Sequence, residues 1–380
     1  MRAVLAFLLL TTAAHAGQTF RVADDAALRA AIRKAQPGDT IRIASGAYAP
    51  GVWIENLHGT AQSPIVIEGD PQSPPEFLGG NEGWHLSDCS HVTLRRLVVG
   101  KQKSNGINID DGGSFDTPAH HIRLEHVRVF DIGPEGNFDG IKLSGLDDFA
   151  VVDCTVEGWG GQAVDMVGCH RGTIERCVFR GKPGFSQHTG PQTKGGSSEI
   201  VLRDCTFDRA GSRPVQLGGS TGLTVFRPQG ALYEAKDITV ENCLFLGGDA
   251  AVACTGLDGG VFRHNTIVRP TKWIMRILQE TTLPGFAPCR NMRFERNLIV
   301  YRRGDLQTIA NVGPNTRPET FAFRENWWYC EDRPAARPDL PAKESDGVYG
   351  VDPHLDANHR PAPAAAQYGR QKESRSREDK

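Results

Sequence analysis

The chain has 380 residues, with 43 lysine and arginine side chains against 45 aspartate and glutamate side chains. A net charge near −2 argues against a nucleic-acid partner, because such partners require a clear basic excess. The 43 glycines exceed average usage and predict many tight turns.

Residues 1–16, MRAVLAFLLLTTAAHA, contain one basic residue, an apolar run and the small-x-small ending Ala14-His15-Ala16. This layout is typical of a secretory signal peptide cleaved near Ala16. The apolar run is too short to span a bilayer, so we expect no membrane insertion. The sequence therefore predicts a secreted or periplasmic protein.

Residues 24–43, DDAALRAAIRKAQPGDTIRI, predict a short amphipathic helix. An aspartate stands at the N-cap position, and Leu28, Ala31, Ile32 and Ala35 recur on one helical face. A helix of this kind suits the terminal unit of a repeat array, whose open end exposes apolar side chains.

A short frame recurs through the rest of the chain: an apolar residue, two variable residues, a central residue and a second apolar position before a turn. It is clearest in FAVVDCTVEG (149–158), GTIERCVFRG (172–181), IVLRDCTFDRA (200–210) and ITVENCLFLGG (238–248). The central residues of nine copies are Leu97, Val127, Cys154, Cys177, Cys205, Cys243, Asn265, Asn297 and Asn326. Their spacing of 22 to 38 residues indicates a repeat architecture, and the alternating Val, Ile, Phe and Thr indicate strands.

Short strands in every repeat, joined by glycine-rich bends, predict an all-β fold, the right-handed parallel β-helix. The central residues would then stack about 4.8 Å apart in successive coils. Buried cysteines would pack as small hydrophobes, while stacked asparagine amides would bond along the ladder. A β-propeller is excluded, because its blades need four strands in about 40 to 50 residues and many of the repeat intervals here are shorter.

The nine cysteines are an odd number and have no C-x-x-C zinc spacing. The repeat frame predicts core thiols, with disulfides as the alternative. The expected organisation is a signal peptide at 1–16, a single β-helix domain at 17–356 and a polar, disordered tail at 357–380. We expect a monomer.

The sequence LRAAIRKAQPGDTIRIASGAY (28–48), together with GTAQSPIVIEG (59–69), resembles the opening of secreted parallel β-helix polysaccharide lyases. The chondroitinase B and alginate lyase family is the comparison it fits, and VYGVDPHL (348–355) resembles the end of such coils. The resemblance implies a scaffold of this kind over most of the chain after residue 16, and an acidic polysaccharide or oligosaccharide as substrate.

Outward positions of successive coils form a line along one sheet, because parallel strands stack in register. Counting back from each cysteine aligns DGIKLSG (139–145), AVDMVGC (163–169), QTKGGSS (192–198) and PVQLGGS (214–220). The predicted line is Asn108, Lys142, Asp165, Lys194 and Gln216. The residues expected to flank it are Asp139, His188, Gln192 and Arg213.

Acids and bases stacked on a rigid sheet suit the cleavage of a polyanion. Elimination across a uronic acid removes the C5 proton, which is weakly acidic until the neighbouring carboxylate is neutralised. A cationic side chain or calcium held by carboxylates neutralises it, and a neutral lysine or arginine then takes the proton. The candidates for binding the substrate are Lys142, His188, Gln192 and Gln216.

The catalytic roles come from the resemblance. In the chondroitinase B and alginate lyase family the base is a lysine and the acid an arginine one coil later, and Lys194 with Arg213 resembles that pair. KGG at 194–196 also resembles the surroundings of the catalytic lysine in family nine pectate lyases, where aspartates of preceding coils hold calcium. By that resemblance Asp139 and Asp165 would be calcium ligands. The chain lacks the first family's Asn and Glu-x-Glu calcium set, and Pro214 follows Arg213.

Three alternatives to a lyase remain open from the sequence. A glycoside hydrolase would need two carboxylates, which Asp110-Asp111 and Asp147-Asp148 offer near turns. A uronate C5-epimerase shares the proton abstraction, and a non-catalytic carbohydrate-binding rod needs no base at all. In the last case Lys194 would be an ordinary solvated lysine.

Overall fold

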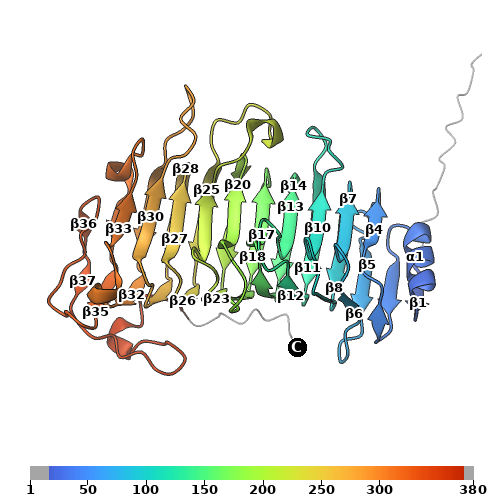
Figure 1. The fold of residues 1–380 in the computed structure, drawn as a ribbon, viewed down its shortest axis with the longest axis horizontal. Helices are drawn as coiled ribbons and strands as arrows, with labels where there is room; N and C mark the ends of the chain where they lie inside the picture. The colour runs from blue at the N-terminus through green and yellow to red at the C-terminus, as the bar shows by residue number, and fades with distance from the viewer. Residues whose placement is uncertain (1–16, 372–380) are drawn as a thin grey trace, which may run out of the picture.

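The strand repeats assemble into three long parallel sheets that run the length of the molecule (Figure 1). The computed structural model describes residues 17–371, so the predicted signal peptide at 1–16 and the tail beyond residue 371 lie outside the described part of the chain. Successive coils contribute strands to each sheet in turn, which makes a parallel β-helix. Within residues 17–371 no helix is long and apolar enough to cross a membrane.

Sheet A contains β1 (Thr19–Val22), β2 (Thr40–Ile43), β5 (Ile65–Gly69), β8 (Ser90–Arg95), β11 (Ala119–Glu125), β14 (Leu146–Asp147), β15 (Ala150–Val152), β18 (Thr173–Glu175), β21 (Ser197–Ser198), β22 (Val201–Arg203), β25 (Ala235–Glu241), β28 (Leu257–Arg263), β31 (Arg290–Glu295), β34 (Ala322–Arg324) and β36 (Glu344–Ser345). Sheet B contains β3 (Ala47–Tyr48), β6 (Glu76–Leu78), β9 (Val98–Gly100), β12 (Arg128–Ile132), β16 (Thr155–Trp159), β19 (Val178–Arg180), β23 (Thr206–Asp208), β26 (Leu244–Leu246), β29 (Thr266–Val268), β32 (Leu298–Tyr301), β35 (Trp327–Cys330) and β37 (Val348–Tyr349).

Sheet C contains β4 (Val52–Glu55), β7 (Trp84–Ser87), β10 (Ile107–Asp110), β13 (Ile141–Ser144), β17 (Gln162–Val167), β20 (Thr189–Lys194), β24 (Val215–Gly218), β27 (Ala250–Thr255), β30 (Trp273–Leu278) and β33 (Ala310–Val312). Four single-turn 3₁₀ helices interrupt the loops: η1 (Leu223–Val225), η2 (Arg303–Asp305), η3 (Pro318–Thr320) and η4 (Pro363–Ala365).

The core is a set of stacked columns, because alternate residues of each strand point inward. In sheet C, Ile107 of β10 pairs with Ile141 of β13, and Ile141 pairs with Val164 of β17, all three fully buried. In sheet B, Phe179, Phe207 and Phe245 stack with ring centroids 5.2 and 4.6 Å apart. These separations match the spacing of hydrogen-bonded strands, about 4.8 Å, so one coil adds one ring.

The predicted ladder of central residues is confirmed. All nine cysteines are buried and free, and the Cys177 thiol donates to the Val151 carbonyl of the coil before at 3.4 Å. Further along, the Asn265 side chain donates to the Asn297 amide oxygen at 3.2 Å, and Asn297 donates to Asn326 at 3.0 Å. The ladder changes from thiols to amides, and the amides bond from coil to coil.

Helix α1 (Asp25–Lys34) lies at the N-terminal end of the three sheets (Figure 1). Asp24 caps it as predicted, because its carboxylate accepts from the Ala27 backbone N–H at 2.8 Å. Leu28, Ala31 and Ile32 are buried in the main core. That the helix closes the open coil stays a prediction.

The C-terminal segment differs from the expected disordered tail. Between residues 357 and 371 the chain folds back along sheet B, with Ala365 and Tyr368 buried against β32 and β35. The Tyr368 ring meets Trp327 edge-on at 5.3 Å, and the Arg370 backbone N–H donates to the Thr266 hydroxyl at 2.9 Å. Ala365 and Tyr368 thus anchor a segment that was expected to belong to a disordered tail.

The asparagine ladder generates a stability prediction. Asn297 is fully buried and bonds to the Asn265 backbone N–H, the Phe262 carbonyl and the Asn326 amide. Asn297→Ala leaves those groups without partners, so we expect the free energy of unfolding to fall by roughly 3 kcal/mol. Thermal unfolding followed by circular dichroism measures the effect, with the exposed Asn81→Ala as control. Equal melting temperatures for the two variants would contradict the ladder's role.

Candidate active site

A line of polar side chains runs across sheet C at one position per strand. Strand pairing aligns Asn108 of β10 with Lys142 of β13, Lys142 with Asp165 of β17, Asp165 with Gln192 of β20, and Gln192 with Gln216 of β24. The prediction is confirmed for Asn108, Lys142, Asp165 and Gln216.

The predicted alignment of Lys194 with Asp165 is wrong, because Lys194 pairs with Val167 and lies two residues further along the strand. The physical reason is the next turn, which contains two left-handed glycines, Gly195 (φ 64°) and Gly196 (φ 88°). The coil before turns with Gly168 alone at that place (φ 60°). The longer turn adds a residue between the polar line and Cys205, so counting back from that cysteine misplaces the line. Gln192, rather than Lys194, lies beside Asp165.

Lys194 nevertheless reaches the line through its side chain. The Lys194 ammonium lies 2.9 Å from Oδ1 of Asp165, and the Lys142 ammonium lies 2.7 Å from Oδ2 of the same carboxylate. The Asp165 side chain has no exposed surface, whereas those of Lys142 and Lys194 are 26% and 15% exposed. One buried carboxylate therefore holds two ammonium groups at the surface of the sheet.

Asp139 adds a second buried carboxylate to this group. Its Oδ2 lies 3.3 Å from the Lys142 ammonium, and its Oδ1 accepts from the Gln162 backbone N–H at 2.9 Å. Burial and the nearby Asp165 charge raise the pKa of Asp139 above its usual range. For Lys142, burial opposes the charge, but the Asp165 and Asp139 carboxylates outweigh it and raise the pKa of the ammonium.

Glu234, which the sequence analysis did not single out, supports the strand end that carries Lys194. It is fully buried and accepts from the Gly195 backbone N–H and the Thr221 backbone N–H, each at 2.9 Å. Glu234 lies 39 residues after Gly195, and no local motif links the two. Only the three-dimensional structure brings this carboxylate to the turn.

The turn at Gly195 and Gly196 also lies against a segment of the chain that crosses it. A Cβ at Gly196 would lie 2.4 Å from the Arg227 carbonyl, so the glycine admits a crossing chain segment. The Arg227 guanidinium continues over Gly168 and Gly145 to Asp111, donating through Nη2 to Oδ1 at 2.9 Å and through Nε to Oδ2. A loop from one coil is thereby tied across three others.

Gln192 and Gln216 point their amides at the same backbone carbonyl. Both donate to Gly218, at 3.0 and 3.4 Å, and each residue is at most 6% exposed. Oε1 of Gln216 is buried and has no hydrogen-bond partner among the described residues. The two glutamines therefore lie on the same face of the sheet as Asp165, but their amides are held against the backbone and have little exposed surface.

Arg213 lies one coil after Lys194, as predicted, but at the other end of the strands. Arg213 bridges to Thr189, the first residue of β20, and Lys194 is its last residue. Five strand positions correspond to about 16 Å. Burial and the neighbouring Arg276 lower the pKa of Arg213. The structure does not bring Arg213 and Lys194 together.

His188 is exposed and directly precedes β20, at the same end as Arg213. In β30, two strands further along sheet C than β24, Trp273 is buried. Arg276 lies over the Trp273 ring, 4.6 Å from its centroid. Basic groups are thus present at both ends of the strands of sheet C, and Lys142 and Lys194 are the two that share the buried Asp165 carboxylate.

The donors around Asp139 and Asp165 do not form a calcium site as they stand. Calcium takes six to eight oxygen ligands, whereas one oxygen of each aspartate faces the Lys142 ammonium. The second oxygen of Asp165 faces Lys194, and that of Asp139 accepts from a backbone N–H. An ammonium occupies the place that a bound cation would need, so these aspartates as arranged have no room for a calcium ion.

The other end of the line contains a second group that the sequence analysis missed. His85 pairs with Asn108, and its ring nitrogens lie 2.7 Å from Asp110 and 2.9 Å from Glu82. Burial opposes the charged imidazole, but these two carboxylates raise the pKa of His85 to about 9. The half-exposed Trp53 covers the ring at a centroid distance of 3.7 Å. The line therefore continues as an aromatic and cationic surface.

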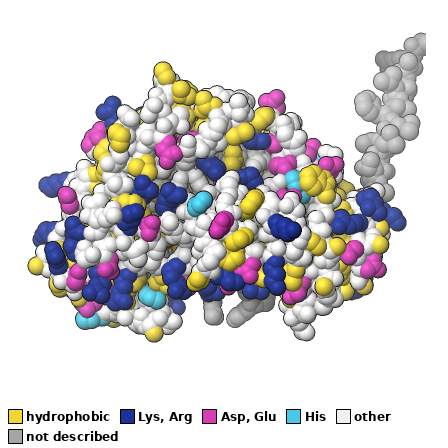
Figure 2. Space-filling model, in the orientation of Figure 1, with side chains coloured by type: hydrophobic (Ala, Val, Ile, Leu, Met, Phe, Trp, Pro, Cys, Tyr) yellow, Lys and Arg dark blue, Asp and Glu magenta, His cyan; other side chains and the backbone are white. Residues whose placement is uncertain are grey.

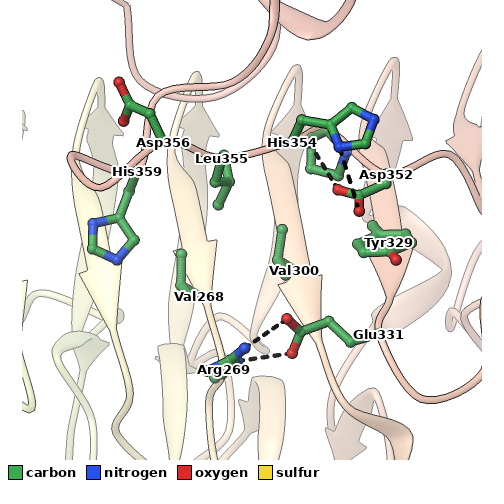
Figure 3. A pocket seen from close by; sticks show the side chains of 11 residues that line it. Val268, Arg269, Val300, Tyr329, Glu331, Asp352, His354, Leu355, Asp356 and His359 are labelled. Carbon is green, nitrogen blue, oxygen red and sulfur yellow. Dashed lines mark hydrogen bonds and ion pairs between the residues drawn. The ribbon is translucent and has the colours of Figure 1, made fainter.

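A separate pocket of about 510 Å³ lies between sheet B and residues 352–359 of the C-terminal segment (Figure 3). Arg269 and Glu331 pair across its floor at 2.7 Å, and His354 and Asp352 lie on its rim. It shares no residue with the line on sheet C.

Over the face shown in Figure 2, acidic and basic side chains are interspersed, so charge alone does not mark a site there. We therefore place the candidate site at the Lys142–Asp165–Lys194 group.

The three stacked parallel sheets define the class of protein as a parallel β-helix, and similarity to known proteins shows that the helix is right-handed. Residues 135–273 match a family model described as a right handed beta helix region. No curated protein matches the chain by sequence. Similar solved structures nevertheless cover most of its length.

A PL6 family polysaccharide lyase from Pseudopedobacter saltans aligns over 93% of this chain and 99% of its own, at 12% identity and a TM-score of 0.59. The alginate lyase from Paenibacillus sp. str. FPU-7 aligns over 87% and 95%, at 15% identity and 0.55. A rhamnogalacturonan lyase aligns over 79% and 86%, at 16% identity and 0.55. At such identities the likeness establishes the fold, so the predicted right-handed parallel β-helix is confirmed.

The raised pKa of Asp139 generates a prediction for the pH dependence of stability. Because the folded state holds this proton more tightly than the unfolded state, ionisation of Asp139 reduces stability as the pH rises above the carboxyl's ordinary value of 3.8. Asp139→Asn removes the ionisable group and with it this loss of stability. The melting temperature of the variant minus that of the wild type should therefore increase between about pH 4 and 7. The exposed Asp116→Asn serves as control, and a difference that stays constant with pH would refute the assignment.

Proposed function

We propose that the protein is a polysaccharide lyase that cleaves an acidic, uronate-containing polysaccharide by β-elimination. The observation that carries the proposal is the buried Asp165 carboxylate holding the Lys142 and Lys194 ammonium groups at the face of sheet C. The fold supports it, since the similar structures named above are polysaccharide lyases.

In the proposed reaction Lys142 binds the uronate carboxylate and neutralises its charge, which makes the C5 proton more acidic. Lys194, in its neutral form, takes that proton. The electron pair of the C5–H bond forms the C4–C5 double bond as the bond from C4 to the glycosidic oxygen breaks. The leaving oxygen takes a proton, so the products are a new chain end and an unsaturated uronate.

The proton for the leaving oxygen has two candidate donors. Arg213 is the donor that the family resemblance implies, but its register is five strand positions from Lys194. Lys142 shares a carboxylate with Lys194 and is partly exposed, which favours it as the nearer donor. Gln192, Gln216 and His188 remain proposed substrate-binding residues, and calcium binding by Asp139 and Asp165 remains a proposal that the chelator test below addresses.

Export is part of the same proposal. A polymeric substrate is too large to enter a cell unaided, and residues 1–16 have the layout of a secretory signal peptide. The protein would then act in the periplasm or outside the cell.

The base assignment is tested with the chain from Gln18 onward and a panel of uronate polysaccharides. Wild-type protein should raise the ultraviolet absorbance of a newly formed unsaturated uronate. Lys194→Ala and Lys194→Arg should each lower the rate by about 10²-fold or more, because proton abstraction is lost. Lys103→Ala, an exposed lysine away from the line, should leave it unchanged. Assays with calcium and with chelator show whether a metal takes part.

Other outcomes of that assay identify the alternatives. Reducing ends released without ultraviolet absorbance would indicate hydrolysis, and inverted C5 without chain cleavage would indicate an epimerase. Binding without turnover, unaffected by Lys194→Ala, would indicate a binding rod. The acid pairs that a hydrolase would use are engaged elsewhere, with Asp111 held by Arg227 and Asp147 by Arg171.

The identity of the proton donor is tested by comparing Lys142→Arg with Arg213→Ala. If Lys142 is the donor, the alkaline limb of the pH–rate profile should move to higher pH in Lys142→Arg, because a guanidinium keeps its proton longer. Arg213→Ala should leave that limb in place. A shift or a loss of the limb in Arg213→Ala alone would assign the role to Arg213.

A further inference from the structure

Three histidines meet on the edge of sheet A, at the turn that follows sheet C. His91 comes from β8, and His120 and His121 come from the next coil in β11. One side-chain ligand atom from each of the three lies within 4.8 Å of the others. Nδ1 of His120 is 2.9 Å from Nδ1 of His121, and the His91 and His121 rings stack with centroids 4.3 Å apart.

The backbone explains why neighbouring residues point the same way. Successive side chains of a strand normally face opposite sides, so His120 and His121 should diverge. His121 has a left-handed conformation with φ 55°, and His91 has the same conformation with φ 53°. Ser90 pairs with His120, and Val92 pairs with Ile122, so the two left-handed histidines occupy equivalent positions in adjacent coils. Stacking in register thus collects three imidazoles on one side.

In the next coil, Asp147 and Asp148 occupy the positions that correspond to His120 and His121. These two aspartates form ion pairs with Arg171, at 2.7 and 2.9 Å, and His170 pairs with Asp147 at 2.9 Å. Within residues 17–371, no carboxylate lies within ion-pair distance of the three clustered histidines. Their close contacts are instead with one another.

We propose that His91, His120 and His121 form a binding site for a divalent transition-metal ion, with zinc as the reference metal. Neutral imidazoles are preferred ligands of zinc, cobalt, nickel and copper, whereas calcium and magnesium prefer oxygen. Nitrogens bound to one tetrahedral zinc at about 2.0 Å lie roughly 3.3 Å apart, close to the His120–His121 separation. His121 is exposed, so its ring is free to turn toward a shared ion. A fourth position would remain open to water.

The charges around the cluster suit this chemistry. Burial and the neighbouring imidazoles lower the pKa values of His91 and His120. His58 acts on His120 in the same direction, while Asp147 and Asp148 act against it. The site joins two consecutive coils and is distinct from the Lys142–Asp165–Lys194 group, so it stands whether or not the chain is a lyase.

The test uses the chain from Gln18 onward, prepared without a histidine tag. Zinc binding is measured by calorimetry, and cobalt is added as a spectroscopic probe whose visible absorption reports nitrogen coordination. We expect one saturable site per chain, unaffected by excess calcium. His91→Asn and His121→Asn should each weaken zinc binding more than about tenfold, the least that even outer-shell partners contribute at metal sites.

His126→Asn is the matched control, because His126 is also exposed and left-handed (φ 53°) but lies outside the cluster. Asparagine tolerates that conformation, so the substitutions test ligation rather than backbone strain. If His121→Asn does not fold, His120→Asn replaces it. The proposal is overturned if zinc shows no saturable binding, or if the cluster variants bind it as tightly as His126→Asn.

Discussion

Hydrogen bonding of each coil to the next fixes the positions of the side chains in the three sheets. Because parallel strands pair without slippage through sheets A, B and C, a residue's closest neighbours are those at the same position one coil away. The phenylalanine stack, the thiol and amide ladder, the polar line on sheet C and the histidine cluster are four results of this one constraint. A favourable contact in one coil can therefore be repeated at the same position of the next coil. A charged side chain likewise finds its partner at that position in an adjacent coil.

The polar line shows how the constraint serves chemistry. Buried carboxylates are costly unless they are paired, and Asp165 is paired on both oxygens. The pairing holds two cations at fixed positions on a rigid sheet, without the loss of side-chain freedom that substrate binding would otherwise impose. The same pairing holds Lys194 as an ammonium, so in the proposed reaction this ion pair with Asp165 would have to open before the lysine acts as a base.

The fold could be predicted largely from sequence, because the cysteine and asparagine frame marks one fixed position in each coil. The frame located Asn108, Lys142, Asp165 and Gln216 correctly. It failed at Lys194 because the turn with Gly195 and Gly196 is longer than the turn before it, and turn length leaves no mark on the strand pattern. Glu234 and Arg227 were out of reach of any local pattern, since their partners lie 39 and 116 residues away.

The Arg227–Asp111 pair also changes how the rod should behave mechanically. A solenoid is held together by contacts between adjacent repeats, so its parts can open one at a time from an end. This ion pair instead joins the coil of β10 to the loop that follows β24 and passes over the coils between them. The enclosed coils cannot separate singly while it is intact. The segment that carries Lys142, Asp165 and Lys194 is thus expected to open as one cooperative block, protected from fraying at either end of the molecule.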